Sequence, residues 1–220
     1  MIAWLGYEAW TWPRVGALAT RPPRTTAFIE RYRAEQRAAG RPDHVQWIWV
    51  AYGAISMQVK RAVVVGEDIG FFGHGGVDLD EVEEALGRAV KRKALPRGAS
   101  TITQQLAKNL WLTAAWSPLR KAREAILAWQ LERTLTKRRI LELYLNVAEF
   151  GPGCYGVEAA ARRYFARSAG DVGPVEAAQL AASLPNPRAW HPGSTSRPYQ
   201  AYVARVLRRM ERADWLDRLL

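Results

Sequence analysis

An acidic pair, Glu67 and Asp68, closes the apolar run at 62–65, and this junction constrains the chain more than any other feature. Four consecutive apolar residues (AVVV) belong in a hydrophobic core, so Glu67 is expected to leave that core at the edge of a cleft. A carboxylate in such an apolar setting has a raised pKa and can take a proton from a hydroxyl group. Glu67 is therefore a candidate general base, although a glutamate at this place is, taken alone, more often a solvated residue at a helix end.

A second carboxylate, Glu124, has two cations on nearly the same side of its predicted helix, Arg120 and Lys121. It also shares an apolar stripe with three leucines: Leu127, Leu131 and Leu135. An exposed ion pair of this kind is common and contributes only about 0.2–0.5 kcal/mol. Because an unpaired buried charge is costly, a glutamate within an apolar stripe indicates a functional site instead.

A third polar group follows the glycine turn at Gly98, where Ser100 and Thr101 begin a helix. Free N–H groups and the positive end of the helix dipole are expected to be available to an anion there. The polar side chains of the next two turns lie on adjacent faces: Gln104, Gln105, Lys108 and Asn109. Without its neighbours this segment would be an ordinary N-capped helix.

The cations decide between two kinds of sugar chemistry. A glycosidase must protonate the sugar oxygen that leaves, which requires a neutral carboxylic acid. A diphosphate leaves without a proton, but it requires positive charge and hydrogen-bond donors around it. The basic residues beside Glu124 and at the helix start favour transfer of a sugar away from a diphosphate.

Helical signals dominate the chain, alternating strand patterns are nearly absent, and the predicted fold class is mainly α. A polar helix is expected over 25–40. Asp78 would cap a helix that continues to residue 90. Ser117–Pro118 and Gly173–Pro174 each place a cap before a proline at the first helical position. LPNP at 184–187 stops one helix, and 197–220 reads as one long basic amphipathic helix.

The formal net charge of +11 suits an anionic partner: nucleic acid, lipid headgroups or a phosphorylated substrate. The single cysteine, Cys154, excludes an intrachain disulfide. Three tryptophans fall in the first twelve residues, a composition typical of a membrane interface. That stretch contains Glu8 and is far shorter than the roughly 20 apolar residues of a spanning helix, so no complete transmembrane helix is expected.

Five motifs now stand in order: EDxxFxxHxG at 67–76, GASTITQQxxKN at 98–109, RKxxE at 120–124, KxxILExYLN at 137–146 and AAARRYF at 159–165. With them the chain resembles the peptidoglycan glycosyltransferases, over roughly 58–187. The resemblance implies a lysozyme-like, bilobal helical domain with a small membrane-associated lobe around 70–95. It implies polymerisation of lipid II with inversion, in which a hydroxyl attacks the anomeric carbon of the growing chain and undecaprenyl diphosphate leaves.

The resemblance also assigns roles. Glu67 matches the family's general base, and Glu124 its second essential carboxylate, which acts on the diphosphate or orients the donor. The other polar residues of the motifs become substrate contacts: Asp68, His74, Ser100, Thr101, Gln104, Gln105, Lys108, Asn109, Arg120 and Lys121. No metal ligand is assigned and no cofactor is required, while a divalent cation, Mg²⁺ or Mn²⁺, remains an option at the diphosphate.

Three segments are expected: an anchor-proximal arm with a truncated or missing transmembrane segment (1–24), a connecting helix and linker (25–57) and the glycosyltransferase domain (58–220). Neither SxxK nor KTG occurs, so the chain resembles the monofunctional type. The implied location is the bacterial inner membrane, with the domain on the periplasmic side. Implied partners are lipid II, the growing glycan and the membrane surface, with other cell-wall synthesis proteins left open and nucleic acid excluded.

Two alternatives remain. A lytic transglycosylase or lysozyme-like glycosidase would need one carboxylate kept neutral, against which the cations around Glu124 argue. A basic nucleic-acid-binding module would explain the charge but not the acidic pair. Of lower rank are a brace for the cleft (Glu142, Asn146), glycan contacts (Arg162, Arg163, Tyr164) and an apolar lip toward the lipid (Phe71, Phe72, Trp111, Trp116), for each of which core packing is the commoner role.

Overall fold

The computed structural model describes residues 12–78, 83, 100–113, 115 and 117–220. Within them the α-helices are α2 (Ala27–Ala38), α3 (Met57–Glu67), α5 (Ile102–Trp111), α6 (Pro118–Thr134), α7 (Lys137–Val147), α8 (Val157–Phe165), α9 (Pro174–Ser183) and α10 (Arg197–Met210). Short 3-10 helices are η1 (Val15–Ala19), η2 (Tyr52–Ala54) and η3 (Asp214–Arg218). The strands β1 (Gln46–Trp47), β2 (Glu149–Gly151) and β3 (Cys154–Tyr155) form one small sheet in the order β1-β3-β2. The predicted mainly α, lysozyme-like fold class is confirmed, whereas most of the predicted small lobe lies outside the described residues.

Helix starts follow the local signals in the sequence. The side chain of Ser117 accepts a 3.1 Å hydrogen bond from the N–H of Arg120, and α6 begins at Pro118 as predicted. Thr26 caps α2 in the same way, and α9 begins at Pro174. The helix predicted to follow Asp78 lies outside the described residues apart from Glu83.

The prediction of one long C-terminal helix is wrong, because α10 ends at Met210 and a separate 3-10 helix, η3, follows. Tertiary contacts account for the break. Arg61 of α3 forms ion pairs with Asp214 and Asp217 of η3, and Leu216 between them is fully buried. A straight continuation of α10 would give up these contacts.

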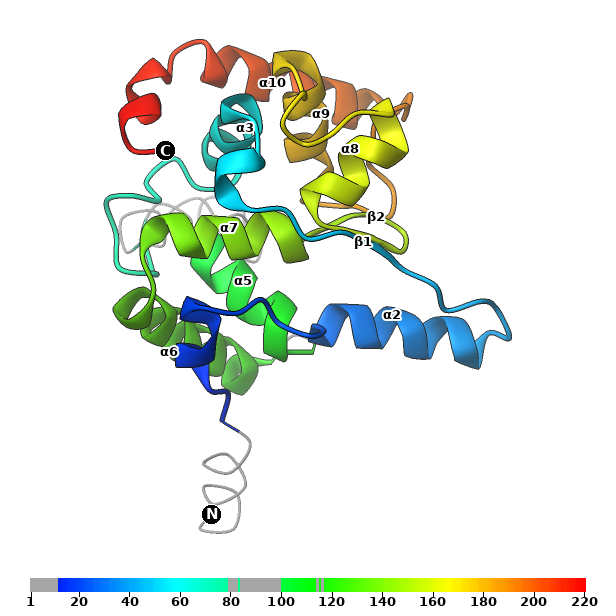
Figure 1. Cartoon of the computed structure of the whole chain (residues 1–220), viewed down its shortest axis with the longest axis vertical. Coiled ribbons are helices and arrows are strands. Elements are labelled where there is room, and N and C mark those ends of the chain that lie inside the picture. Colours follow the sequence, from blue (N-terminus) through cyan, green and yellow to red (C-terminus); the bar gives the residue numbers. More distant parts are fainter. Residues whose placement is uncertain (1–11, 79–82, 84–99, 114, 116) are drawn as a thin grey trace.

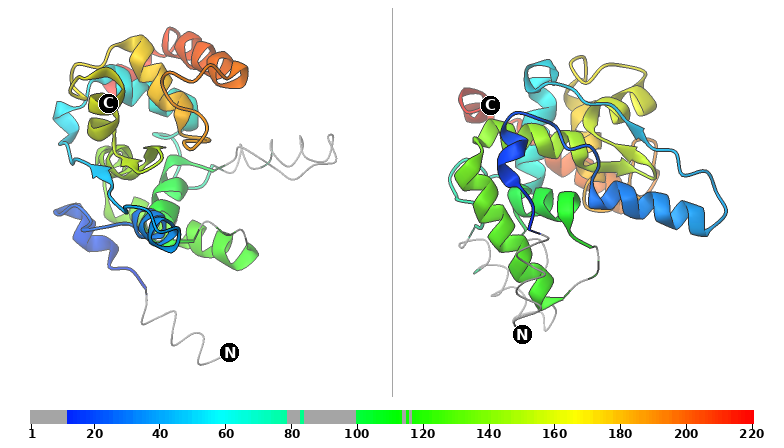
Figure 2. Two further views of the ribbon diagram at one scale, coloured as in Figure 1. Left: turned by 90° about the vertical axis from the view of Figure 1, so that its right-hand side faces the viewer. Right: turned by 60° about the horizontal axis from the view of Figure 1, so that its bottom comes forward.

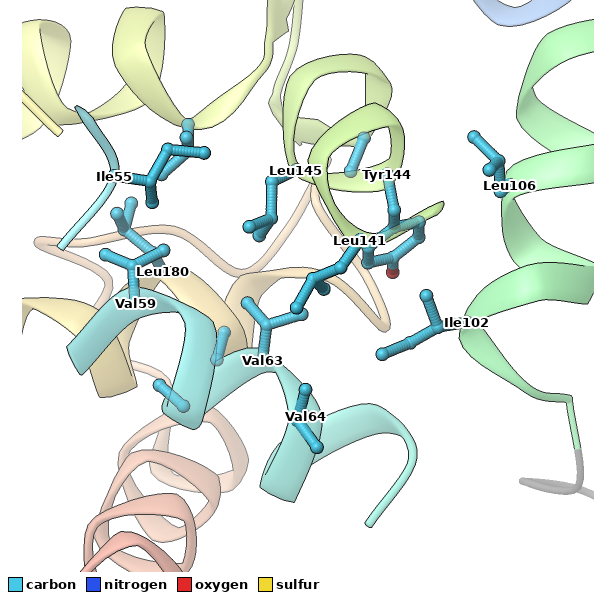
Figure 3. Close-up of a cluster of buried hydrophobic side chains, with 14 of the residues drawn as sticks. Ile55, Val59, Val63, Val64, Ile102, Leu106, Leu141, Tyr144, Leu145 and Leu180 are labelled. Carbon is cyan, nitrogen blue, oxygen red and sulfur yellow. The ribbon is translucent and has the colours of Figure 1, made fainter. Parts of the chain in front are cut away.

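Helix α3 is formed from residues that favour strands. Its β-branched run, Val63–Val65, has modest helix propensity, yet all three valines are fully buried. Ser56 caps the helix, and α3 packs against α9 and α10. In Figure 3, Val63 and Val64 face Leu141 of α7. Burial on several sides therefore stabilises this helix at about 1.5–3 kcal/mol per fully buried aliphatic side chain.

The helices form two groups with α7 between them (Figure 1). One group contains α3, α8, α9 and α10; the other contains α5, α6 and η1, with α2 packed on α5. The left view of Figure 2 also shows these groups apart. The end of α3 and the start of α5 both lie near α7. The motif with the acidic pair (67–76) and the motif with the Ser/Thr-rich helix start (98–109) therefore meet in the middle of the molecule.

The described segments that were expected near a membrane pack against the rest of the protein. Within the predicted arm, η1 packs on α6 and buries Val15 and Leu18. Phe71 is fully buried, so it is a core residue and not part of an apolar lip, and half-buried Phe72 packs edge-on against it at 5.0 Å. Trp111 packs partly buried on the core, and Trp116 lies outside the described residues. No helix in the described ranges is both long and apolar enough to cross a bilayer.

Candidate active site

The loop after α3 is tied to the start of α5 by Asp68. The Asp68 carboxylate accepts hydrogen bonds from the N–H of Ile102 (3.0 Å) and from Nε2 of His74 (3.0 Å). Nδ1 of His74 in turn accepts from the N–H of Gly76 (3.1 Å), so the ring proton lies on Nε2. Gly76 has a φ of +97°, and a Cβ there would lie 3.1 Å from the carbonyl oxygen of Ala128. The glycine, the histidine and the second acid of the motif therefore hold one loop, in which His74 orients Asp68.

Glu67, the last residue of α3, is held by a relay of side chains. Nε2 of Gln105 donates to Oε2 of Glu67 at 2.7 Å, and Oε1 of Gln105 accepts from the hydroxyl of Tyr144 at 2.9 Å. Burial raises the pKa of Glu67 to about 7, against the opposing effects of the Gln105 hydrogen bond and the Lys108 charge. A carboxylate with this pKa is balanced between its acid and base forms at neutral pH.

Helix α10 closes the end of α3 just before Glu67. The hydroxyl of Tyr202 donates to the carbonyl oxygen of Gly66 (2.8 Å), and Nη1 of Arg209 donates to that of Val65 (2.9 Å). These are carbonyls that a helix leaves unpaired at its C-terminus, where a cation is also favourable. Residues distant in sequence thus fix the position of Glu67.

The start of α5 is more occupied than predicted. Thr101 and Gln104 form a reciprocal capping box in which each side chain bonds the other's backbone N–H. The N–H of Ile102 is bonded to Asp68. The prediction of free N–H groups for an anion is therefore wrong at Thr101, Ile102 and Gln104. Thr101 and Gln104 are buried, so their side chains shape the helix start.

Glu124 is 2% exposed and bonded to both predicted cations. Nη1 of Arg120 lies 2.5 Å from its Oε2, and Nζ of Lys121 lies 2.6 Å from its Oε1. Lys121 also donates to the hydroxyl of Ser100 (3.0 Å), at the beginning of the α5 segment. The predicted grouping of Glu124, Arg120, Lys121 and Ser100 is therefore present.

Lys108 is close enough to both carboxylates, Glu67 and Glu124, for their charges to act on it. Burial is the main cause that lowers the pKa of Lys108, whereas the negative charges of Glu124 and Glu67 raise it. Its Nζ is 5.8 Å from the centre of the Phe28 ring. A half-buried cation near both Glu67 and Glu124 can attract an anionic group into the space between them.

Two cavities meet at Gln105 and Pro185, which line both. The first, of about 470 Å³, contains Glu67 and will be called the Glu67 cavity; it is lined by Val65, Gly66, Glu67, Asp68, Ile69, Ser100, Gln105, Pro185, Trp190, Tyr202, Arg205 and Arg209. The second, of about 280 Å³, contains Lys108 and will be called the Lys108 cavity; it is lined by Phe28, Arg31, Gln105, Lys108, Asn109, Tyr144, Ala148, Glu149, Leu184, Pro185, Asn186, Pro187 and Arg188. The candidate base Glu67 lines the first cavity and is hydrogen-bonded to Gln105, which lines both.

Sequence reasoning missed much of this lining. Tyr202, Arg205 and Arg209 lie at i, i+3 and i+7 of α10, a spacing that marks one helix face but not the partner it meets. No local sequence pattern predicted the cavity positions of three further residues, Trp190, Arg31 and Glu149. Tyr144 is a buried residue of α7, and its hydroxyl also holds Gln105.

One group of side chains with metal-ligating atoms occurs among the described residues: Asp68, His74 and Asp78, whose ligand atoms lie within 4.8 Å of one another. Asp68 already accepts two hydrogen bonds and both ring nitrogens of His74 are engaged, so a cation could bind only by breaking this network. At Glu124 each carboxylate oxygen is bonded to a cationic side chain. Neither donor set fits a divalent ion, and the positive charge near the cleft comes from Lys and Arg.

The residues of lower rank are placed outside both cavities. Asn146 bonds the backbone of Val50 through both ends of its amide (2.8 and 2.9 Å), which braces the segment beside β1. Glu142 pairs with Arg139. The three residues predicted to touch the glycan bond locally: Arg162 to Glu158, Arg163 to the carbonyl of Pro152, and Tyr164 to that of Phe150.

Comparisons with known proteins identify the family of the chain. Residues 35–211 match the family model described as Transglycosylase. The chain is 45% identical over 204 residues to a biosynthetic peptidoglycan transglycosylase of Thiobacillus denitrificans, covering 93% of this chain and 88% of the relative. Proteins of the same name from Azoarcus sp. (43% over 209 residues; 94% and 90% covered) and Paraburkholderia xenovorans (42% over 220 residues; 98% and 90% covered) are similarly related.

Proposed function

The chain belongs to the transglycosylase family and is a peptidoglycan glycosyltransferase; from that premise we propose that it polymerises lipid II, transferring the growing glycan from undecaprenyl diphosphate to the next lipid II with inversion. The observation that carries the proposal is Glu67, whose pKa burial raises to about 7 and which lines one cavity beside Gln105, a residue that lines both cavities. One cavity offers a place for the attacking sugar and the other for the sugar that is transferred.

In the proposed reaction, Glu67 takes the proton from the attacking sugar hydroxyl. The hydroxyl oxygen forms a bond to the anomeric carbon while the bond from that carbon to the diphosphate oxygen breaks, and the electron pair leaves with the diphosphate. Because attack and departure occur on opposite faces, the configuration inverts. A positioned base with a pKa near the working pH contributes typically about 10²–10⁴-fold to the rate.

The leaving diphosphate would be bound on the Lys108 side. Lys108 is half-buried near Glu67 and Glu124, and Arg120 and Lys121 are held by the buried carboxylate of Glu124. In this proposal Glu124 does not contact the diphosphate itself. Its carboxylate holds the Arg120 and Lys121 side chains in position, and these two cations bind the diphosphate. Preorganised charge of this kind stabilises the departing group without the cost of reorganisation.

Contact with a membrane surface is supported by the outer face of α6. Four exposed apolar residues recur there at helical spacing, Leu119, Ala122, Ile126 and Trp129, on the face opposite buried Glu124. Arg133 lies over the Trp129 ring at 5.0 Å. An apolar stripe with Trp and Arg fits a headgroup boundary, and we place the enzyme at the periplasmic face of the bacterial inner membrane.

Incubation with labelled lipid II tests the proposal. Glycan polymer on a gel, which a glycan-cleaving enzyme then removes, is the expected result. A second incubation with preformed glycan distinguishes a glycosidase, because shortening of the glycan without any polymer from lipid II would contradict the synthetic direction.

A further inference from the structure

A third cavity lies outside the cleft, on helix α6, against which η1 packs (Figure 1). Its volume is about 350 Å³, and it will be called the Trp12 cavity. It is lined by Trp12, Pro13, Val15, Trp129, Gln130, Arg133 and Thr134. Cavities of this size with aromatic walls and a few polar groups are the usual form of a small-molecule site. None of these residues takes part in the proposed chemistry, so the Trp12 cavity is a candidate binding site of its own.

The aromatic walls of the Trp12 cavity are held in place by polar partners. Nε1 of Trp12 donates a 2.7 Å hydrogen bond to Oε1 of Gln130, and the guanidinium of Arg123 lies over the Trp12 ring at 5.4 Å. The guanidinium of Arg133 lies over the Trp129 ring at 5.0 Å. Cation–π contacts of this kind fix both indoles. A ligand therefore meets a preformed site, which lowers the entropic cost of binding.

The charge of the Trp12 cavity is positive. Arg133 is exposed, and within the described part of the chain it has no carboxylate partner, since the adjacent Glu132 is bonded to Lys137. Stacking on Trp129 uses the face of the guanidinium and leaves its N–H edges available. Arg14, which stands between two lining residues, is exposed as well. Because no described lining residue is acidic, these donors suit a phosphate oxygen pair.

An apolar surface continues from the Trp12 cavity along α6. Trp129 belongs both to the cavity and to the α6 stripe (Leu119, Ala122, Ile126 and Trp129). A ligand that fills the cavity and covers the stripe must carry an anionic group next to an apolar chain. A free phosphate would leave the two indoles and the stripe uncovered, whereas an anionic phospholipid supplies both parts.

We propose that the Trp12 cavity binds the headgroup of one anionic phospholipid, with the phosphate at Arg133, the glycerol region between the two indoles and the acyl chains along the α6 stripe. The proposal rests on the membrane contact in the proposed function and turns a general surface attraction into a site for one lipid. Such a site saturates at one lipid per chain. It also disfavours a headgroup that carries its own cation, because Arg133 and Arg14 would repel that cation.

The test uses dihexanoyl phosphatidylglycerol below its micelle concentration, titrated into the whole chain without vesicles and followed by NMR of the indole N–H groups. We expect saturation at one lipid per chain, with the Trp12 signal among those that shift. Dihexanoyl phosphatidylcholine should bind several-fold more weakly, and glycerol phosphate should show no saturable binding. These two ligands distinguish the anionic lipid from any lipid and from the phosphate alone.

The matched variants change one side chain inside the cavity and one outside it. Arg133→Gln is expected to weaken the binding of phosphatidylglycerol about 5-fold, the effect of one arginine near an anionic lipid. Arg208→Gln, which removes the same charge from an exposed position on α10, should leave it unchanged. Trp129→Ala should also weaken binding, whereas Trp215→Ala, with an equally exposed indole on η3, should not. Thermal melts verify that all four variants are folded.

Equal losses in Arg133→Gln and Arg208→Gln would overturn the site, because they would show a general attraction of charge. Equal affinity for phosphatidylcholine, or binding of glycerol phosphate as tight as that of the lipid, would overturn it too. Vesicle co-sedimentation and lipid II polymerisation test the proposed function separately. A chain that binds anionic vesicles and polymerises lipid II but does not bind the monomeric lipid would therefore refute only the Trp12 cavity site.

Discussion

The side-chain amide of Gln105 donates a 2.7 Å hydrogen bond to Oε2 of Glu67. The other end of the amide accepts from Tyr144, so Gln105 is held with its NH₂ group toward the carboxylate. This bond lowers the pKa of Glu67 while burial raises it, and the balance lies at about 7. Gln105 thus adjusts the base in addition to lining both cavities.

Removing this bond should shift the pH profile. In Gln105→Ala the carboxylate form of Glu67 loses a donor, so its pKa rises further and the ascending limb of kcat/KM moves to higher pH than in the wild type. The rate deficit at pH 7 should shrink at pH 9. The control is Gln130→Ala, because the amide oxygen of Gln130 accepts a hydrogen bond from Trp12 at α6, away from Glu67. If Gln130→Ala gave the same pH profile as Gln105→Ala, the role of Gln105 in setting the pKa of Glu67 would be refuted.

Wild-type kcat/KM should rise with pH through about 7, because only the deprotonated form of Glu67 accepts the proton. Glu67→Gln should lower turnover by about 10²–10⁴-fold at every pH. Labelled lipid II in steady-state assays between pH 5.5 and 9 measures both. If Glu67→Gln kept more than about a third of wild-type turnover, Glu67 would not be the base.

The same substitution should stabilise the protein at alkaline pH. The pKa of Glu67 is raised on folding, so between about 4.5 and 7 the folded state holds a proton that the unfolded chain releases, and stability falls as pH rises through this window. Glutamine removes that dependence. We expect Glu67→Gln to melt above the wild type at pH 8, on the order of a few °C, with a smaller difference at pH 5, in parallel calorimetric scans.

Lys108→Ala and Arg120→Ala should both impair use of the donor, but only the second should lower stability. Lys108 is disfavoured as a cation by its burial, so its loss leaves the melting temperature nearly unchanged. Arg120 is bonded to buried Glu124. Its removal leaves Glu124 with Lys121 as its cationic partner, at a cost of about 1–3 kcal/mol. Normal kinetics of folded Lys108→Ala would contradict its placement at the diphosphate.

Vesicle binding should depend on the α6 stripe. Trp129→Glu is expected to lower co-sedimentation with anionic vesicles several-fold, because it replaces apolar contact by repulsion, and added salt should weaken wild-type binding. Trp215→Glu is the matched control, since Trp215 on η3 is equally exposed, at 51%. If both variants lost vesicle binding equally, the α6 stripe would not be a specific membrane-binding surface.

Interactions between residues close in the sequence account for a large part of the helix boundaries. Ser117–Pro118 and Gly173–Pro174 marked helix starts correctly, because a proline at the first helical position needs no N–H partner and the Ser117 side chain satisfies an N–H group within the first turn. Glu124 and its two cations could also be foreseen, since they lie three and four residues apart on one helix. The acidic pair after an apolar run indicated a carboxylate with a raised pKa, as Glu67 has.

The remaining parts of the site depend on residues that meet only when the chain is folded. Asp68 reaches the start of α5 across 34 residues, Arg209 reaches the end of α3 across 144, and Glu149 and Arg31 share a cavity from different elements. Spacing along one helix or strand carries no information about such encounters. The sequence by itself therefore predicted which residues carry the chemistry and determined which helices hold them. Tertiary packing alone decided their partners, because the free energy of burial selects contacts between surfaces far apart in the chain.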